Sequence, residues 1–248
     1  MCSNYRPVTL QDRLLAHFGV VRPDTETPLE TWPGYNAPFI VRPDAKADAG
    51  QAQGREALVG QYGLLPHWSK DMMLGRKTYN CRSETAAEKP SFREAWRKRR
   101  WCIVPAEELY EPCWETGVAV RWAVRRVAGP MGVAGLWGLW IDPKTGERVP
   151  TFTMLTVNAD EHALYRRFHR PEDEKRMQVI LHPHDFDDWL NCSVDEAMSF
   201  MKAYPADLLE AEPAPLPSRA AAPKKLPRGQ PKVRPPEAPG PETGDLFD

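Results

Sequence analysis

Residues 118–157 read VAVRWAVRRVAGPMGVAGLWGLWIDPKTGERVPTFTMLTV, and this stretch decides the fold class. It contains three largely apolar runs, at 118–127, 132–140 and 151–157, which are separated by segments that contain glycine and proline. Runs of this length that are rich in valine, threonine and aromatic residues and bounded by turn residues are typical of β-strands. The stretch therefore predicts three strands.

Outside this stretch, helical spacing appears in several places. Residues 9–18 carry apolar side chains at helical spacing before Gly19, which suits a helix end, and Ser91 with Glu94 forms a capping-box pattern. Strands and helices do not alternate regularly, so we expect an α+β fold with a largely antiparallel sheet. The remaining predicted elements are a strand at 177–181, short apolar runs at 38–41, 60–65 and 101–104, and helices at 91–100, 159–168, 183–190 and 194–202.

The distribution of proline divides the chain into a domain and a tail. The sequence has 26 prolines in 248 residues, and ten of them lie between residues 213 and 241. Residues 212–248 lack apolar periodicity and cannot bury enough surface to offset chain entropy, so we expect a disordered tail. Residues 1–211 suffice for one folded domain. No transmembrane-length apolar run or signal-peptide core is present, so we expect a cytoplasmic protein without membrane contact, associated with the nucleoid if it is bacterial.

Charge is concentrated in one segment although the formal net charge is only -1. Nine basic and three acidic residues lie between residues 76 and 100, and Phe92, Trp96 and Trp101 are interleaved with them. Such a segment suits a groove that tracks phosphates and stacks bases. The alternative is a solvated helix face whose aromatic side chains point into the core. The candidate DNA contacts in this segment are Arg97 and Arg100.

Cysteine at position 2 is the most unusual placement in the chain. The five cysteines form no C-x-x-C pair, so neither a disulfide framework nor a metal site is expected, and no cofactor is expected. Removal of Met1 would give Cys2 an α-amine next to its thiol. The amine can form a Schiff base with an aldehyde, and the thiol can then close a thiazolidine ring. Alternatively, the thiolate acts as an acyl-transfer nucleophile, or the placement is incidental.

Several motifs occur together with Cys2 in a fixed order. They are YNAP at 35–38, GLLPHW at 63–68, YNCRSET at 79–85, PAEELYEP at 105–112 and HRPEDEKRMQVIL at 169–181. In this order they resemble the SRAP family (SOS response-associated peptidase), whose members are abasic site processing proteins. The resemblance covers about residues 2–205. It implies a single domain with a barrel-like sheet flanked by helices.

The resemblance also implies a function in the DNA damage response. Cys2 would capture abasic sites in single-stranded DNA as a covalent thiazolidine crosslink, and the protein would have lyase and autoproteolytic activity. Asn80 would orient Cys2 or the opened sugar, Glu111 would shuttle protons, and His169 would assist the Schiff-base chemistry and its reversal. Further candidate DNA contacts are Arg82 and Arg176 on phosphates and Trp68 on a base, although a core position for Trp68 is equally compatible with the sequence.

The chain departs from the usual family pattern at three places. Ser3 and Asn4 stand where glycine and arginine are usual, and six residues lie between His169 and Arg176. The usual tryptophan after Tyr-Glu is replaced by Pro112. These departures put in doubt one phosphate contact at the N-terminus and the assignment of His169.

Two other functions remain open from the sequence. One is a peptidase or amidohydrolase with Cys2 as its N-terminal nucleophile, and the other is a DNA-binding module without catalysis. A monomer is expected. The chain ends in GDLFD, which is similar to short peptides that bind replication clamps, so Leu246 and Phe247 are candidate clamp contacts.

Overall fold

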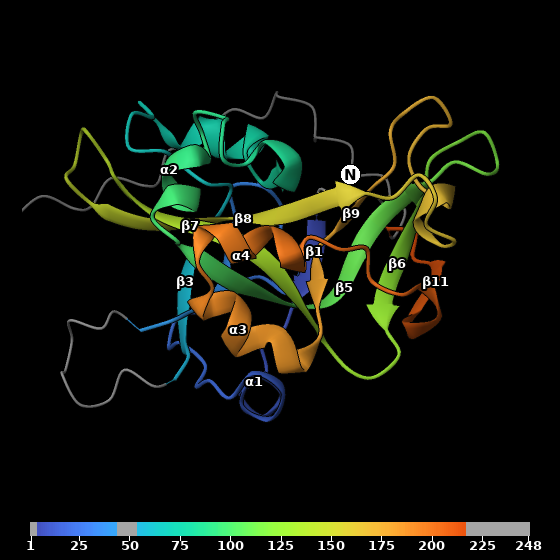
Figure 1. Ribbon diagram of the computed structural model, residues 1–248, viewed down its shortest axis with the longest axis horizontal. Coiled ribbons are helices and arrows are strands. Elements are labelled where there is room, and N and C mark those ends of the chain that lie inside the picture. The colour runs from blue at the N-terminus through green and yellow to red at the C-terminus, as the bar shows by residue number, and fades with distance from the viewer. Residues whose placement is uncertain (1–3, 44–53, 217–248) are drawn as a thin grey trace, which may run out of the picture. The chain divides into compact units, whose positions relative to one another are not determined.

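The structure, a computed structural model, describes residues 4–43 and 54–216 (Figure 1). The eleven strands of this described part belong to one sheet. In chain order they are β1 Asn4–Pro7, β2 Asn36–Val41, β3 Glu56–Tyr62, β4 Asn80–Arg82, β5 Trp101–Cys113, β6 Val120–Arg126, β7 Met131–Ile141, β8 Arg148–Asn158, β9 Arg176–Gln178, β10 Ile180–Leu181 and β11 Leu209–Pro213. The α-helices of the same part are α1 Gln11–Phe18, α2 Arg93–Arg97, α3 Phe186–Asn191 and α4 Val194–Ala197. None of them is long and apolar enough to cross a bilayer.

Five of the strands close into a barrel. β7 pairs with both β5 and β8, β8 pairs with β3, β3 pairs with β2, and β2 returns to β5. The pairings in the described part are antiparallel except those of β3 and β4 with β8. Closure removes the free edges of these strands and gives their inward side chains a shared core. The expected α+β fold with a mainly antiparallel, barrel-like sheet is confirmed.

The stretch that predicted three strands folds into β6, β7 and β8. β7 and β8 pair directly, but β6 does not pair with β7, because β5 lies between them. The first half of β5 pairs with β7 and its second half with β6. The short apolar run seen at 101–104 is therefore only the beginning of a strand of 13 residues that joins the barrel to the rest of the sheet.

The helix predicted at 91–100 is shorter than expected, and its predicted capping box is wrong. The N-cap residue of α2 is Phe92, and no side chain caps the helix. Glu94, which was expected to complete the box, bonds instead to His67 Nδ1 and Lys98 Nζ, each at 2.6 Å. These two partners draw the carboxylate away from the start of the helix.

A second predicted helix, at 159–168, is also wrong. This segment contains only one 3₁₀ turn, Tyr165–Arg167. Nδ1 of His162 accepts the backbone N–H groups of Leu164 and Tyr165, at 3.2 and 3.0 Å. A side chain that binds nearby backbone groups in this way competes with helical hydrogen bonding. By contrast, α1 ends at Gly19 as predicted, with a left-handed φ of 69°.

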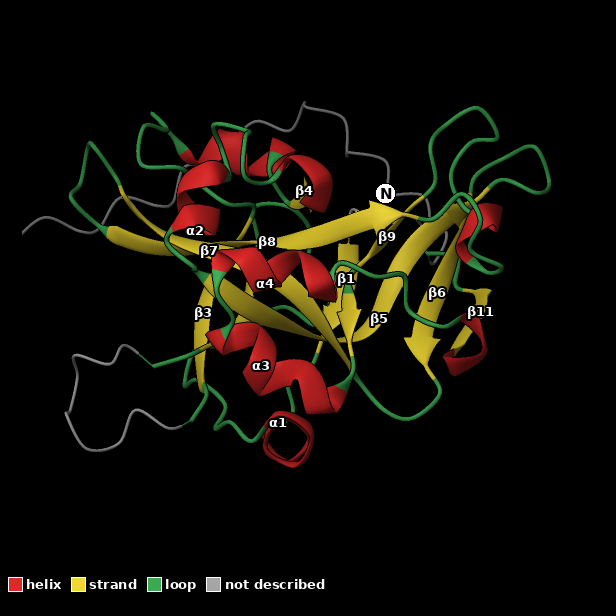
Figure 2. Cartoon of the chain, viewed as in Figure 1, coloured by secondary structure: helices red, strands yellow, loops and turns green. Residues whose placement is uncertain are grey.

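The aromatic residues of the basic segment belong to the core. Phe92, Trp96 and Trp101 are 9%, 4% and 2% exposed. Trp101 packs against Trp96 and Trp189 with ring centroids 5.0 and 4.8 Å apart. These side chains are not available to stack on bases from solvent, so the groove interpretation is wrong for them. α2 lies against β7 and α3 against β5, as Figure 2 shows.

The folded unit extends past the boundary predicted at residue 211. β11 pairs with β6 from Leu209 to Pro213, and Arg125 of β6 forms ion pairs with Glu210 and Glu212. The compact unit reaches Pro215. Proline is tolerated in an edge strand such as β11, so the first prolines of the predicted tail do not mark the end of the fold. The candidate clamp contacts Leu246 and Phe247 lie outside the described residues.

Gly63 should be indispensable to the fold. Its φ is 124°, and an added Cβ would overlap the carbonyl group of Gly75. We expect Gly63→Ala to lower the free energy of unfolding by roughly 2–5 kcal/mol, from backbone strain together with overpacking. Gly117→Ala is the control, because Gly117 has a φ of 78° but open space around its Cβ position. Its cost should be about 1–2 kcal/mol. Urea unfolding measures both, and equal losses would contradict the packing argument.

Candidate functional site

A buried ion pair between Glu111 and His169 forms the centre of the candidate site. Glu111 lies near the end of β5 and is fully buried, and His169, which follows a 3₁₀ turn, is 6% exposed. His169 Nε2 lies 2.9 Å from Glu111 Oε2. A carboxylate and an imidazole in contact can pass a proton between them, and each fixes the orientation of the other. The structure therefore brings together two of the predicted catalytic residues.

The backbone of His169 is held in a strained conformation. Its φ is 63°, which costs a non-glycine residue about 1–2 kcal/mol. The His169 N–H donates to the Pro112 carbonyl at 2.8 Å, and Phe168 forms a β-bridge with Cys113. These contacts tie the loop to the end of β5 and hold the imidazole against Glu111. Nδ1 of His169 is buried and has no hydrogen-bond partner within the described ranges.

Gln178 is a member of the site that sequence analysis missed. It lies in β9, is fully buried, and places Nε2 3.5 Å from Glu111 Oε1. Its amide therefore donates to the carboxylate oxygen that His169 does not contact. The available signal was a lone glutamine inside the apolar strand predicted at 177–181, since a buried polar side chain requires a partner.

Asn80 enters the site from β4, next to a tyrosine pair. The Tyr62 hydroxyl donates to Asn80 Oδ1 at 3.5 Å. The Tyr62 ring also packs edge-on against Tyr5 of β1, with ring centroids 5.3 Å apart. Tyr62 thus connects Asn80 to the first strand. Sequence analysis did not single out Tyr62, because a tyrosine at the end of an apolar run is unremarkable in a sequence.

The register of the sheet explains how these distant segments meet. β4 and β9 flank β8, where Asn80 pairs with Met154 and Gln178 pairs with Thr156. Paired residues share a face, and residues two apart on a strand share that face as well. Asn80 and Gln178, together with Glu111, therefore lie on one side of β8. Figure 1 shows β9 at the end of β8.

β1 runs alongside β5, next to the strand position of Glu111. Asn4 pairs with Tyr110, the residue before the buried carboxylate. The Asn4 side chain donates to Glu30, and Glu30 forms an ion pair with Arg121 at 2.7 Å. The Arg121 guanidinium lies over the Tyr110 ring, 3.4 Å from its centroid. This chain of contacts holds Asn4, the first described residue of β1, against β5.

Four of the five cysteines lie in the described part, and all four are buried. Burial raises the pKa of the Cys81 and Cys102 thiols, and it raises that of Cys192 to about 11. These thiols stay protonated at neutral pH and are poor nucleophiles. Cys2 and Ser3 lie outside the described residues. In the described part of the chain, no cluster of histidine, cysteine and acidic side chains could hold a metal ion.

The two arginines predicted to bind phosphate lie in different settings. Arg82 is half exposed and pairs with Glu174 at 2.7 Å. Arg176 is 2% exposed, and its guanidinium binds Glu84, Glu174 and the carbonyl of Thr156. Its charge is matched by protein oxygens that join β8, β9 and the turn after β4. The structure therefore gives Arg176 a scaffolding position rather than the predicted phosphate contact.

The other predicted DNA contacts lie at the surface. Trp68 is 48% exposed, which excludes the alternative of a core position. Arg97 is exposed on α2, and the Arg100 guanidinium lies 5.4 Å from the centroid of the Trp137 ring. The contacts described for these three side chains do not involve Glu111 or His169. The structure thus separates them from the ion pair at the centre of the site.

Comparison with known proteins identifies the family. The family model described as SOS response associated peptidase (SRAP) matches residues 1–215. The chain therefore belongs to the SRAP family. A crystal structure of a protein from Bordetella bronchiseptica has a TM-score of 0.78 and 38% identity, and the match covers 87% of this chain and 100% of that one.

Among curated proteins, the chain is similar to two abasic site processing proteins of Bacillus subtilis. YoaM is 31% identical over 223 residues, which cover 85% of this chain and 89% of YoaM. YoqW is 35% identical over 159 residues, which cover 61% of this chain and 66% of YoqW, just under two thirds of its length. The abasic site processing protein HMCES of Gallus gallus is 26% identical over 160 residues, which cover 54% of this chain and 46% of HMCES.

The scaffolding position of Arg176 can be tested by stability. We expect Arg176→Met to lower the free energy of unfolding by at least about 2 kcal/mol, because a buried side chain loses several charge-assisted hydrogen bonds. Arg82→Met, the half-exposed control, should cost less than about 1 kcal/mol. Chemical denaturation measures both, and equal small losses would contradict the scaffolding position.

The stability difference between wild type and Arg176→Met should depend on pH. Partial burial, the largest single effect, raises the pKa of Glu84, but the hydrogen bonds and charge of Arg176 together with backbone hydrogen bonds outweigh it, so the pKa lies below its usual range. A lowered carboxyl pKa stabilises the fold above the unfolded pKa of about 4.3, and this stabilisation is lost as the pH falls through the lower folded value. The difference between the two proteins should therefore shrink in acid.

Proposed function

We propose that this protein processes abasic sites in single-stranded DNA by capturing the opened sugar on Cys2 after removal of Met1. One observation carries the proposal: the buried Glu111–His169 ion pair lies beside the strand that follows Cys2. Asn4 pairs with Tyr110, next to Glu111. Cys2 precedes Asn4 by two residues, which span at most about 7 Å. Membership of the SRAP family and similarity to proteins named for abasic site processing support the same function.

The proposed reaction consists of two additions and one dehydration. The α-amine of Cys2 attacks the C1 aldehyde of the open abasic deoxyribose, and the resulting carbinolamine loses water to form an imine. The Cys2 sulfur then attacks the imine carbon, and the nitrogen takes up the proton that the thiol releases. The product is a five-membered thiazolidine that joins protein and DNA, with one water molecule released overall. No external oxidant or reductant is needed.

Glu111 and His169 fit the proton transfers of this sequence. The hydroxyl group of the carbinolamine must accept a proton to leave as water, and the ring opening of the sugar also needs a proton donor and an acceptor. The ion pair offers both, because His169 retains Nδ1 while Nε2 contacts Glu111. Reversal of the crosslink would use the same groups in the opposite order. Asn80, held by Tyr62, would orient the opened sugar.

Two exposed side chains, Arg82 and Trp68, fit contacts to the DNA strand. Arg82 is half exposed, and its planar guanidinium suits a phosphate beside the abasic residue. Trp68 offers a half-exposed indole for stacking on a neighbouring base. We place this reaction in the DNA damage response, in the compartment that holds the DNA.

The second candidate is a peptidase that uses Cys2 as its nucleophile, and the family name, SOS response associated peptidase, favours it. Removal of Met1 would be its minimal activity, with Glu111 or His169 as the base. The proposed crosslinking also requires a free α-amine on Cys2. Mass spectrometry of the purified protein should therefore show loss of Met1 in either case, and the two candidates differ in the product formed with DNA.

Incubation with single-stranded DNA that contains one abasic site tests the proposal. We expect a shifted band that survives heat and SDS in wild type and is absent in Cys2→Ala. Cys2→Ala retains an α-amine after loss of Met1, so borohydride reduction should trap its imine and restore the band. Absence of any adduct from a protein with an N-terminal Cys2 would overturn the proposal. Tight binding without an adduct would instead indicate a non-catalytic DNA-binding module.

The Glu111–His169 ion pair should act as one unit in crosslinking. We expect Glu111→Gln and His169→Gln each to slow the single-turnover rate by about 10²–10⁴-fold, and the double variant to be no slower than the slower single variant. Glu115→Gln is the matched control, since Glu115 follows β5 by two residues but pairs with Arg167 at the surface. Wild-type rates in the single variants would place the proton transfers elsewhere.

A further inference from the structure

We propose that a hollow over α2 binds a nucleotide unit of the DNA strand that flanks the abasic residue, apart from the capturing site. This inference rests on the proposed function. The hollow has a volume of about 610 Å³, which is within the range of pockets that hold small organic ligands. Its lining comes from α2, from Ala87 before the helix, from His67 and from Val194 of α4.

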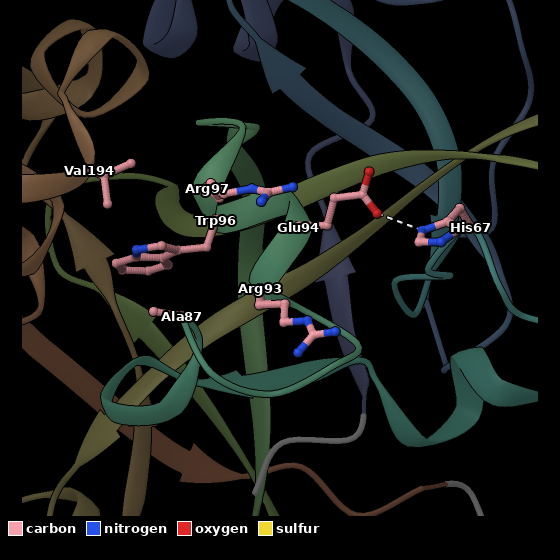
Figure 3. A pocket seen from close by; sticks show the side chains of 7 residues that line it. All are labelled: His67, Ala87, Arg93, Glu94, Trp96, Arg97 and Val194. Carbon is pink, nitrogen blue, oxygen red and sulfur yellow. Dashed lines mark hydrogen bonds and ion pairs between the residues drawn. The ribbon is translucent and has the colours of Figure 1, made fainter.

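The hollow has an apolar end and a charged end. Figure 3 shows Trp96, Ala87 and Val194 to one side of α2 and Arg93, Glu94 and His67 to the other, and the Arg97 side chain points away from the Trp96 indole. The lining is therefore apolar on one side and cationic on the other, which suits a nucleotide: its base would pack against Ala87 and Val194 beside the buried Trp96, and its phosphate would meet the guanidinium groups. Guanidinium groups bind phosphate oxygens in pairs and also stack on bases.

The positive charge of the hollow is not neutralised by the protein. Arg93 and Arg97 are exposed, and neither forms an ion pair with another described residue. The one acid of the lining, Glu94, is already matched by Lys98 and His67, each at 2.6 Å. Hydrogen bonding from Lys98 holds the pKa of Glu94 below its usual range, so this carboxylate stays ionised and occupied. Two guanidinium groups are thus left for an external anion.

Neighbouring hollows continue the positive surface around α2. One shares His67 and Glu94 with the first and adds Lys98 and Arg100. A strand laid across them would find cations in succession, as tracking of a phosphodiester backbone requires. A single phosphorylated metabolite would not need this continuation. The observations therefore favour a nucleic-acid strand over a free nucleotide.

The polypeptide itself connects the hollow to the capturing site. Ala87 follows Arg82 by five residues, and the 3₁₀ turn Ser83–Thr85 lies between them. Glu84 of this turn is bound by the buried guanidinium of Arg176. The ion pair between Arg176 and Glu84 thus holds in place the segment that runs from β4, which contains Asn80, to the edge of the hollow.

The test is the salt dependence of binding to an undamaged 15-nucleotide single strand, measured by fluorescence anisotropy in a Cys2→Ala background. Arg93→Ala with Arg97→Ala should reduce the slope of log K against log salt by about 1.4, since each phosphate contact in a single strand contributes about 0.7. The matched control is Arg22→Ala with Lys202→Ala, which removes the same charge from exposed residues elsewhere and should leave the slope unchanged. Arg93→Lys with Arg97→Lys retains both charges and should retain the slope.

An unchanged slope in the double alanine variant would overturn the inference, and so would an equal loss of slope in the control. It would also be overturned if the double alanine variant lost binding to poly-glutamate as much as binding to DNA, because that would indicate a general anion surface or an acidic protein partner. Binding of deoxyadenosine monophosphate as tightly as the strand would reassign the hollow to a free nucleotide. Because the binding assay needs no reaction at Cys2, failure of crosslinking in wild type would remove the proposed function without obscuring this result.

Discussion

Continuous backbone pairing of β5 is the constraint on which the rest of the structure depends. Its residues from Trp101 to Ala106 pair with β7 inside the barrel, and those from Leu109 to Cys113 pair with β6, while β1 pairs with its second half. Side chains alternate along a strand, so the backbone pairing of β5 determines both how the barrel closes and to which face Glu111 points. A slip of one residue would turn this carboxylate out of the site.

The fold buries two ionisable side chains, Glu111 and Arg176, and each is matched in a different way. Glu111 meets His169 and Gln178, whereas Arg176 meets Glu84 and Glu174. A fold tolerates a buried charge only with partners of suitable geometry. In the first cluster, one ring nitrogen of His169 has no partner among the described residues. The second has its hydrogen-bonding capacity largely taken up by protein oxygens, and it positions the segment that leads from β4 to α2.

Sequence analysis succeeded where the signal was local or was an ordered set of motifs. The strands β6, β7 and β8 follow from apolar runs between turn residues, and the motif order indicated Glu111 and His169 before their contact was known. It failed where a distant side chain intervened. His67 removes Glu94 from the expected capping box, and Arg176, which looked like a phosphate ligand, is enclosed by carboxylates from two other segments. Such partners cannot be deduced from spacing along the chain.

By itself, the sequence determined the family, the strand content and the residue types of the site, because these depend on patterns within short segments. The tertiary structure alone decided which of these residues meet. Gln178 joins Glu111, Tyr62 joins Asn80, and Trp96 enters the core while Arg93 and Arg97 remain outside. The physical reason is that burial and pairing follow from the register and closure of a sheet assembled from the whole chain, and no short segment contains that information.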